Sequence, residues 1–233
     1  MPGPFHFKQF SIHQDRCAMK VSEIACLFGA WVPIPSEAKR ILDIGSGTGL
    51  LSMMLAQRSR AFVEGIEIDT EAWKQSCENI QASQFAGRIT TYNQDILQFT
   101  SEHQYDLIVC NPPFFENQLP SIDRKKNLAW HSSALRLSNL LPTVKQFMAP
   151  SGRLGILLPA NRFTECEQLA LMQGLYLQKV LYVRHSRQHP VRHVLILFNQ
   201  EQHPVDNKEM AIHNKTVYSS AFRELLKPFY LKL

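Results

Sequence analysis

A predicted strand that runs directly into a glycine-rich loop is the feature that most constrains this fold. Arg40–Ile44 is short and largely apolar, and Gly45-Ser46-Gly47-Thr48-Gly49 follows it without a break. We predict a helix next, over about Leu50–Gln57. Glycine permits tight turns and lets a ligand approach the backbone closely. The order strand, glycine loop, helix therefore predicts an α/β fold with a nucleotide-type site at Gly45, Gly47 and Gly49.

The kind of ligand follows from what the loop lacks and from the next acidic residue. Leu50 stands where a dinucleotide fingerprint would have its third glycine, which favours a smaller adenosyl ligand over a pyrophosphate. Glu67 lies near the end of the predicted strand Ala61–Ile68, 18 residues after Gly49. An acid at about this distance can accept hydrogen bonds from ribose hydroxyls, and Asp69 is a rival candidate.

A third predicted strand, Ile89–Asn93, is followed by Asp95. Its carboxylate could accept the exocyclic amine of an adenine. The alternative is a structural role, as the N-cap of a short helical turn.

The predicted strand Tyr105–Cys110 ends at Asn111-Pro112-Pro113-Phe114. Proline cannot donate to a sheet ladder, so the prolines should end the strand in a stiff loop at its carboxyl end. The Asn111 amide and the Pro112 carbonyl could accept the two hydrogens of a planar amino group while Phe114 stacks on its ring. A proline-stiffened turn without chemistry is the alternative.

Composition limits the class of protein. The 233 residues are 45% hydrophobic, enough for a full core, and we expect a single domain over 1–233 with an arm and helix (1–35), a core (36–200) and a docking segment (201–233). The five cysteines lack Cys-x-x-Cys spacing, so we expect reduced thiols, no metal and a cytoplasmic location. No apolar run approaches the length of a membrane span.

Basic residues gather in two segments that we predict to be loops. The net charge is +5, which is compatible with a nucleic-acid partner but equally with an ordinary basic protein. A predicted hairpin turn at 184–193 holds three Arg and three His, and a second segment holds three consecutive basic residues. Either these are solvated loops, or they flank an RNA-binding face formed by Arg184, Arg187, Arg192, Arg124, Lys125 and Lys126.

Most of the remaining chain is predicted to complete the sheet and cover it. We expect a short strand in the N-terminal arm, a break or kink at Pro142 of one helix, mostly loop over 199–217, and a last helix that Pro228 stops before Phe229 docks. The remaining predicted helices are 22–31, 70–83, 133–147 and 161–173. The remaining predicted strands are 152–158, 175–183 and 194–198.

Several of these segments resemble a known family. Leu42–Gly49, Glu67, Asp95 and Asn111–Phe114 resemble the class I S-adenosylmethionine-dependent methyltransferases that modify amino groups. The two ends narrow the resemblance to the bacterial tRNA1(Val) adenine N6-methyltransferases, which methylate the adenine just 3′ of the anticodon. The segments that carry this narrower similarity are Phe7–Phe10, Asp15–Val21, Gly29–Trp31 and Phe229–Leu231.

The resemblance implies a Rossmann-like fold: a seven-stranded, mostly parallel sheet with helices on both faces and an antiparallel last strand. It implies S-adenosylmethionine as cofactor, valine tRNA as partner, and a monomer. The implied catalytic residues are Asn111, Pro112 and Phe114. The implied cofactor-binding residues are Asp43, Gly45, Gly47, Gly49, Glu67, Asp95, Asn111 and Lys20.

Two positions depart from the family pattern. Ser22-Glu23-Ile24-Ala25 stands where Gly-Thr-Asp-Gly is usual beside the cofactor, and Glu23 is the candidate substitute. Trp130 stands where a basic residue is usual, as a packed aromatic or as a platform for RNA. Other functions stay open: methylation of a protein Gln side chain, methylation of another RNA or DNA adenine, or RNA binding without catalysis.

Overall fold

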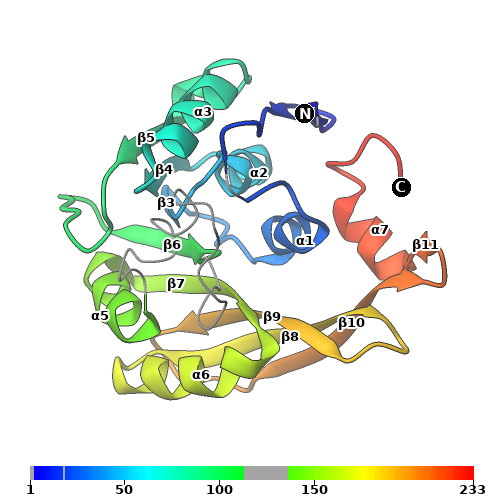
Figure 1. The fold of residues 1–233 in the computed structure, drawn as a ribbon. Helices are drawn as coiled ribbons and strands as arrows, with labels where there is room; N and C mark the ends of the chain where they lie inside the picture. The colour runs from blue at the N-terminus through cyan, green and yellow to red at the C-terminus, as the bar shows by residue number, and fades with distance from the viewer. Residues whose placement is uncertain (1–2, 18, 113–135) are drawn as a thin grey trace, which may run out of the picture.

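The computed structural model describes residues 3–17, 19–112 and 136–233, and the strands of the main sheet lie within these ranges (Figure 1). Nine strands form this sheet in the order β11-β10-β8-β9-β7-β6-β3-β4-β5. A separate pair joins β1 (Phe5–His6) to β2 (Ser11–Ile12). The strands of the main sheet are β3 (Arg40–Ile44), β4 (Phe62–Glu67), β5 (Ile89–Asn93), β6 (Tyr105–Cys110), β7 (Met148–Pro159), β8 (Tyr176–Ser186), β9 (Val191–Asn199), β10 (Asp206–Asn214) and β11 (Val217–Tyr218).

Seven of these strands are the predicted ones, and their directions agree with the expected class I fold. The strands β5, β4, β3, β6 and β7 run parallel to one another, whereas β9 is antiparallel to both β7 and β8. The predicted turn at 184–193 is narrower than expected, because β8 extends to Ser186 and β9 begins at Val191.

The prediction of mostly loop over 199–217 was wrong. Residues Asp206–Asn214 form β10, which pairs parallel with β8, and the short β11 closes the edge. Within β10 only Ile212 is buried. An edge strand whose side chains mostly face water lacks the apolar alternation that signals a strand.

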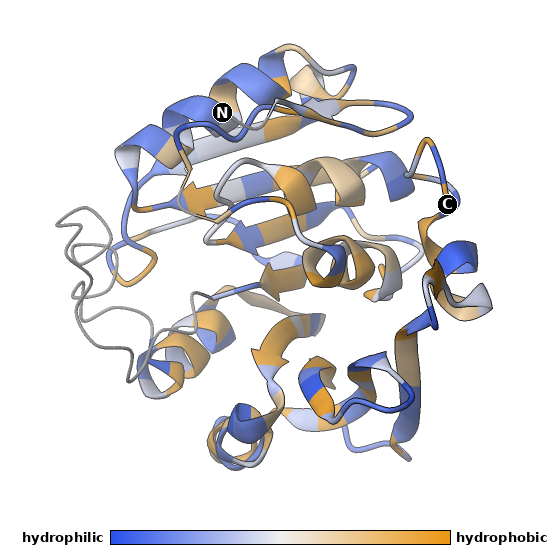
Figure 2. Cartoon of the chain, turned by 45° about the vertical axis from the view of Figure 1, so that its right-hand side comes forward, coloured by the Kyte–Doolittle hydropathy of each residue, from blue (hydrophilic) through white to orange (hydrophobic). Residues whose placement is uncertain are grey.

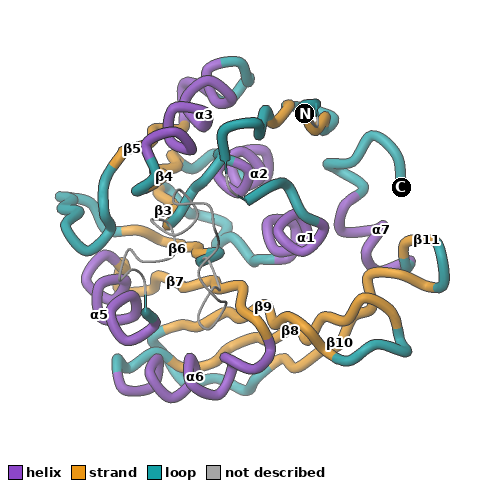
Figure 3. The backbone as a smooth tube through the Cα atoms, viewed as in Figure 1, coloured by secondary structure: helices purple, strands orange, loops and turns teal. Residues whose placement is uncertain are grey.

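Helices cover both faces of the sheet, as expected (Figure 3). On one face lie α1 (Glu23–Trp31), α2 (Leu50–Arg58), α3 (Thr70–Gln81) and α7 (Ser220–Leu226). On the other lie α5 (Leu137–Phe147) and α6 (Phe163–Met172). The predicted break at Pro142 is wrong, because α5 continues through it. Because Pro142 has no N–H, the Ser138 carbonyl four residues earlier loses its helical hydrogen bond. Ser138 is exposed, so water can replace that bond.

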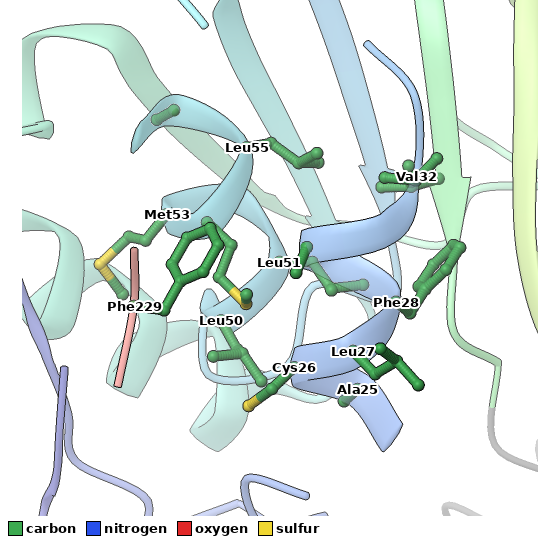
Figure 4. Packing of buried hydrophobic residues seen from close by; sticks show 14 of the residues in the cluster. Ala25, Cys26, Leu27, Phe28, Val32, Leu50, Leu51, Met53, Leu55 and Phe229 are labelled. Atoms are coloured by element: carbon green, nitrogen blue, oxygen red, sulfur yellow. The ribbon is translucent and has the colours of Figure 1, made fainter. Parts of the chain in front are cut away.

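Buried side chains form one core on each face. One core joins α1, α2 and the chain ends to the sheet; the other lies under α5 and α6. The middle strands are correspondingly rich in apolar residues (Figure 2). Figure 4 shows Leu51 of α2 directed toward α1, and Phe229 lying beside Met53. Phe229 is fully buried, so the predicted docking of the C-terminal tail is confirmed. No helix in the described ranges is long and apolar enough to cross a membrane.

Strand register brings four predicted site segments to one edge. Ile44 pairs with Cys110 on one side and with Ile66 on the other, and Glu67 pairs with Asn93. The carboxyl ends of β3, β4, β5 and β6 therefore lie side by side. Glu67 ends β4, and the segments that follow the other three strands carry the glycine loop, Asp95 and Asn111. Ligands of open α/β sheets bind at such an edge.

Candidate active site

The glycine loop adopts the conformation that its glycines permit. Gly45, Gly47 and Gly49 have φ values of 73°, 54° and 83°, a left-handed region that strains other residues. The Gly45 and Ser46 amides donate to the Ile66 carbonyl at 2.8 and 3.0 Å, which fastens the loop to β4. Gly49 caps α2 without a side-chain bond. The loop is thus a rigid cradle between β3 and α2.

Glu67 lies against this loop. Its two carboxylate oxygens accept hydrogen bonds from the Gly47 amide at 2.8 Å and the Asp69 amide at 2.9 Å. Its side chain is nearly buried, and burial is the largest cause of a raised pKa. Each oxygen keeps a second lone pair for a ligand hydroxyl. The rival Asp69 caps α3, because its Oδ1 accepts from the Ala72 amide at 2.7 Å.

The Asp43 side chain is more deeply buried than expected for a carboxylate that faces a ligand at the end of a strand. It is fully buried, and its Oδ2 accepts a hydrogen bond from the Ser52 hydroxyl of α2 at 2.6 Å. Its Oδ1 is buried without a hydrogen-bond partner among the described residues. Burial raises the pKa of Asp43 from 3.8 to about 6, and the Glu67 charge also raises it. The two carboxylates therefore share one electronegative region below the loop.

One carboxylate oxygen of Asp95 has the structural role that was the alternative prediction, the capping of a short turn. Its Oδ1 accepts from the Leu97 amide at 2.9 Å, which caps a turn after β5. The side chain is half-buried. A carboxylate has acceptor capacity beyond one bond, so capping leaves room for an amine donor.

Asn111 and Pro112 follow β6 directly, and β6 lies next to β3 in the sheet. Asn111 is half-buried and Pro112 is buried. The amide of Asn111 therefore stands beside the strand that carries the glycine loop. Phe114, Arg124, Lys125, Lys126 and Trp130 lie outside the described residues.

Comparison with known proteins places this geometry in a family. Residues 30–185 match the family described as the methyltransferase small domain. A tRNA1(Val) (adenine(37)-N6)-methyltransferase of Dyadobacter fermentans is 40% identical over 234 residues, covering 98% of this chain and 97% of the relative. The enzyme of the same name from Trichodesmium erythraeum is 36% identical, with 98% of both chains covered. The chain belongs to the tRNA1(Val) (adenine(37)-N6)-methyltransferase family.

Solved structures agree with this family's fold. A predicted O-methyltransferase of Agrobacterium tumefaciens superposes with a TM-score of 0.66 at 15% identity, covering 88% of this chain and 95% of that one. The N-methyltransferase NodS of Bradyrhizobium japonicum, in complex with S-adenosyl-L-homocysteine, superposes with a TM-score of 0.53 at 16% identity, covering 77% and 85%. At these identities the likeness shows the class I fold alone.

The N-terminal arm reaches the glycine loop in this family member. A Cβ placed on Gly47 would lie 3.9 Å from the Cys17 Sγ atom, and the Cys17 thiol is itself buried. Lys20, expected at the cofactor, donates to the Gln14 carbonyl and to the Cys17 carbonyl at 3.0 Å. Its ammonium group therefore fixes the bend of the arm. Sequence reasoning did not single out Cys17, because one cysteine beside Arg16 carries no spacing signal.

Asn79 of α3 joins the arm to the glycine loop and was also missed. Its Oδ1 accepts the His13 amide at 2.9 Å, and its Nδ2 donates to the His13 carbonyl at 2.9 Å and to the Thr48 carbonyl at 3.0 Å. Gln75, one turn earlier, binds the Arg16 amide at 3.1 Å and the Asp15 carboxylate at 2.6 Å. Both side chains are buried, and their hydrogen bonds hold the N-terminal arm against α3 and the glycine loop. We call this set of hydrogen bonds the latch.

Two further candidate residues have partners of their own. The Oε1 of Glu23, the candidate substitute acid, lies 3.5 Å from the Nε2 of His213. Arg184 is half-buried and pairs with Glu209 at 2.7 Å, so its charge is already compensated. Arg187 and Arg192 are exposed, and they remain the candidates of this turn for RNA phosphates.

Proposed function

We propose that this chain transfers the methyl group of S-adenosylmethionine to N6 of adenine 37 in tRNA1(Val). The supporting observation is the placement of Asn111 and Pro112 beside the glycine loop, at the ends of neighbouring strands β6 and β3. The relatives that carry this activity in their names align over nearly the whole chain, including both ends. Such an activity acts on tRNA and belongs in the cytoplasm, in a single domain of 233 residues.

The residues around the loop fit this cofactor. S-adenosylmethionine carries a positive sulfonium, a positive ammonium and two ribose hydroxyls. Asp43 and Glu67 offer two buried carboxylates with raised pKa values, and Asp43 Oδ1 lacks a partner among the described residues. A cationic ligand relieves this arrangement, whereas a pyrophosphate would add like charge to it. We assign Glu67 to the ribose, Asp95 to the adenine amine, and Asp43 to support of the loop.

The proposed mechanism depends on placing the acceptor amine. The bound cofactor supplies an electrophilic methyl group on sulfur. The lone pair of an adenine N6 amine is conjugated with its ring, which makes it a poor nucleophile. The Asn111 amide oxygen and the Pro112 carbonyl would accept the two amine hydrogens, which favours a tetrahedral nitrogen with its lone pair free to attack the methyl carbon. The carbon–sulfur bond would break as the nitrogen–carbon bond forms, S-adenosylhomocysteine would leave, and the surplus proton of the amine would pass to water. Phe114 stacks on the base once it has left its neighbours.

The tRNA would lie along the carboxyl edge of the sheet. We assign phosphate contacts to Arg187 and Arg192 of the β8–β9 turn, together with Arg124, Lys125 and Lys126. Arg184 supports the turn through Glu209.

The deciding experiment incubates the protein with cofactor and valine tRNA, then measures N6-methyladenosine by nucleoside mass spectrometry. We expect one methyl group per tRNA, and none on a transcript with guanine at position 37. Methylation of a release-factor protein in place of tRNA would overturn the proposal in favour of the Gln side-chain alternative.

An Asn111→Ala variant tests the assignment of the acceptor. Asn111 should act mainly in the transition state, so we expect single-turnover methylation to slow by about 10²–10³-fold with nearly unchanged cofactor and tRNA affinity. Asn111→Asp should retain more activity, because its carboxylate still accepts from the amine. A near wild-type rate in Asn111→Ala would reduce Asn111–Phe114 to a plain turn.

A further inference from the structure

Three potential metal ligands converge away from the glycine loop. They are Glu23 at the start of α1, His185 in β8 and His213 in β10. One ligand atom from each lies within 4.8 Å of the other two. The residues are far apart in sequence, and the sheet brings them together at its carboxyl edge. Neither the glycine loop nor Asn111 takes part in this cluster.

The cluster is not explained by hydrogen bonding alone. The Glu23 Oε1 atom lies 3.5 Å from the His213 Nε2 atom, longer than the ~2.7–2.9 Å of a charge-assisted hydrogen bond. The Nδ1 atom of His213 is buried and has no partner among the described residues. An anion is a poor occupant, because the Glu23 carboxylate would repel it. A cation that binds nitrogen and oxygen suits this donor set.

Neighbouring groups already hold two of the three ligands in place. The Tyr218 ring stacks on the His213 ring, with centroids 5.0 Å apart and an interplanar angle of 27°. The Tyr218 hydroxyl is also a neighbour of Glu23, because burial and then the Glu23 carboxylate raise the pKa of this phenol. In metal sites, groups that orient the ligands in this way are part of the design.

His185 is the exposed member of the cluster. Its ring lies 4.5 Å from that of His213 and edge-on to that of His189, at 5.2 Å. Since its side chain faces solvent, His185 can rotate without disturbing the core.

We propose that Glu23, His185 and His213 form a zinc-binding site with a fourth position open to water. Two histidines and one carboxylate are a known three-ligand set for Zn²⁺. Ligand bonds of ~2.0–2.1 Å in a tetrahedron place ligand atoms about 3.4 Å apart. The Glu23–His213 separation of 3.5 Å already fits this spacing. Closing the remaining separations, at most 4.8 Å, needs only a small rotation of His185.

A metal here would connect three elements. The ligands come from α1, β8 and β10, so a bound ion would tie the N-terminal helix to the edge strands of the sheet. An ion that binds only the folded chain raises the stability of that chain. This consequence is independent of methyl transfer and of the proposed function.

The test uses full-length protein without a histidine tag, stripped by a chelator and titrated with ZnCl₂ by calorimetry. We expect saturable binding of one Zn²⁺ per chain and a rise in Tm. Cobalt chloride should give the visible absorption of a tetrahedral site. Glu23→Gln, His185→Asn and His213→Asn should each weaken zinc binding at least ten-fold. The matched control is His103→Asn, since His103 is an exposed histidine outside the cluster; it should bind as the wild type does.

One further variant and one folding check keep the result interpretable. Tyr218→Phe preserves the ring that stacks on His213 but removes the hydroxyl, so it should weaken zinc binding roughly 10-fold. His185 is exposed, and its variant should keep the circular dichroism spectrum of the wild type. The proposal is overturned if folded His185→Asn binds zinc as tightly as His103→Asn, or if the wild type takes up none.

Discussion

Replacing Asn79 by Leu should loosen the N-terminal arm and thereby weaken cofactor binding. Leucine has similar size but removes three hydrogen bonds, two to His13 and one to Thr48. At about 1 kcal/mol each, these bonds amount to about 3 kcal/mol, or roughly 150-fold in an equilibrium constant. The buried backbone groups left behind can regain partners only if the arm moves into water. We therefore expect cofactor affinity to fall at least ten-fold, with roughly 150-fold as the ceiling.

The assay is calorimetric titration of the variant with S-adenosylmethionine, with S-adenosylhomocysteine as a second ligand. Glu78→Gln is the matched control, because Glu78 lies on the same helix but forms only an exposed ion pair with Arg16. Such pairs contribute about 0–1 kcal/mol, so cofactor affinity should stay within a few-fold. Tyrosine fluorescence and urea unfolding would verify that Asn79→Leu remains folded. A folded Asn79→Leu protein with wild-type affinity for both ligands would refute the latch.

Four other variants test the remaining assignments. Glu67→Gln should weaken cofactor binding about ten-fold or more in calorimetry, since a hydrogen bond to a charged group contributes roughly 1.5–3 kcal/mol; unchanged affinity would remove Glu67 from the site. The double variant Arg187→Gln/Arg192→Gln should lower the salt dependence of tRNA binding by about two phosphate contacts, whereas Arg184→Gln should leave it unchanged. If the wild type and both variants show the same dependence of tRNA affinity on salt concentration, the turn is only a solvated loop. Asp43→Asn should gain stability over the wild type as pH rises from about 4 to about 6, measured by urea unfolding. The pKa of Asp43 rises from 3.8 to about 6 on folding, so between these values the folded state holds a proton that the unfolded chain has lost. Wild-type stability therefore falls over this window by about 3 kcal/mol and does not recover above it, whereas asparagine cannot titrate. A stability difference independent of pH would contradict this reasoning.

The central part of the fold could be predicted closely because its signals are local. The strands β3, β5 and β6 begin and end at the predicted residues. The apolar residues of β3 and β6 are buried, and β5 is bounded by clear turn residues. The glycine loop and Glu67 follow from the same local order. The roles assigned to residues within 113–135 remain predictions, because these residues lie outside the described ranges.

What could not be predicted depends on contacts between distant segments. The polar residues Gln75 and Asn79 look like the solvent face of α3, yet the arm buries them. The complete burial of Asp43 could not be predicted either, because burial of a strand end depends on the helix packed against it, here α2 with Ser52. Glu23 and His213 are brought together by tertiary packing, in which α7 lies against both α1 and β10, and the sequence pattern did not reveal β10.

The contact between the two ends of the chain has a consequence for biosynthesis. The Lys8 amide donates to the Phe229 carbonyl at 2.8 Å, and Phe7 pairs with Tyr230. Lys8 therefore waits for its partner until 221 more residues (229 minus 8) have been synthesised. At about 5–20 residues per second this wait is roughly 10–45 s. Until then the arm lacks its C-terminal partner, so we expect this contact to form late in synthesis.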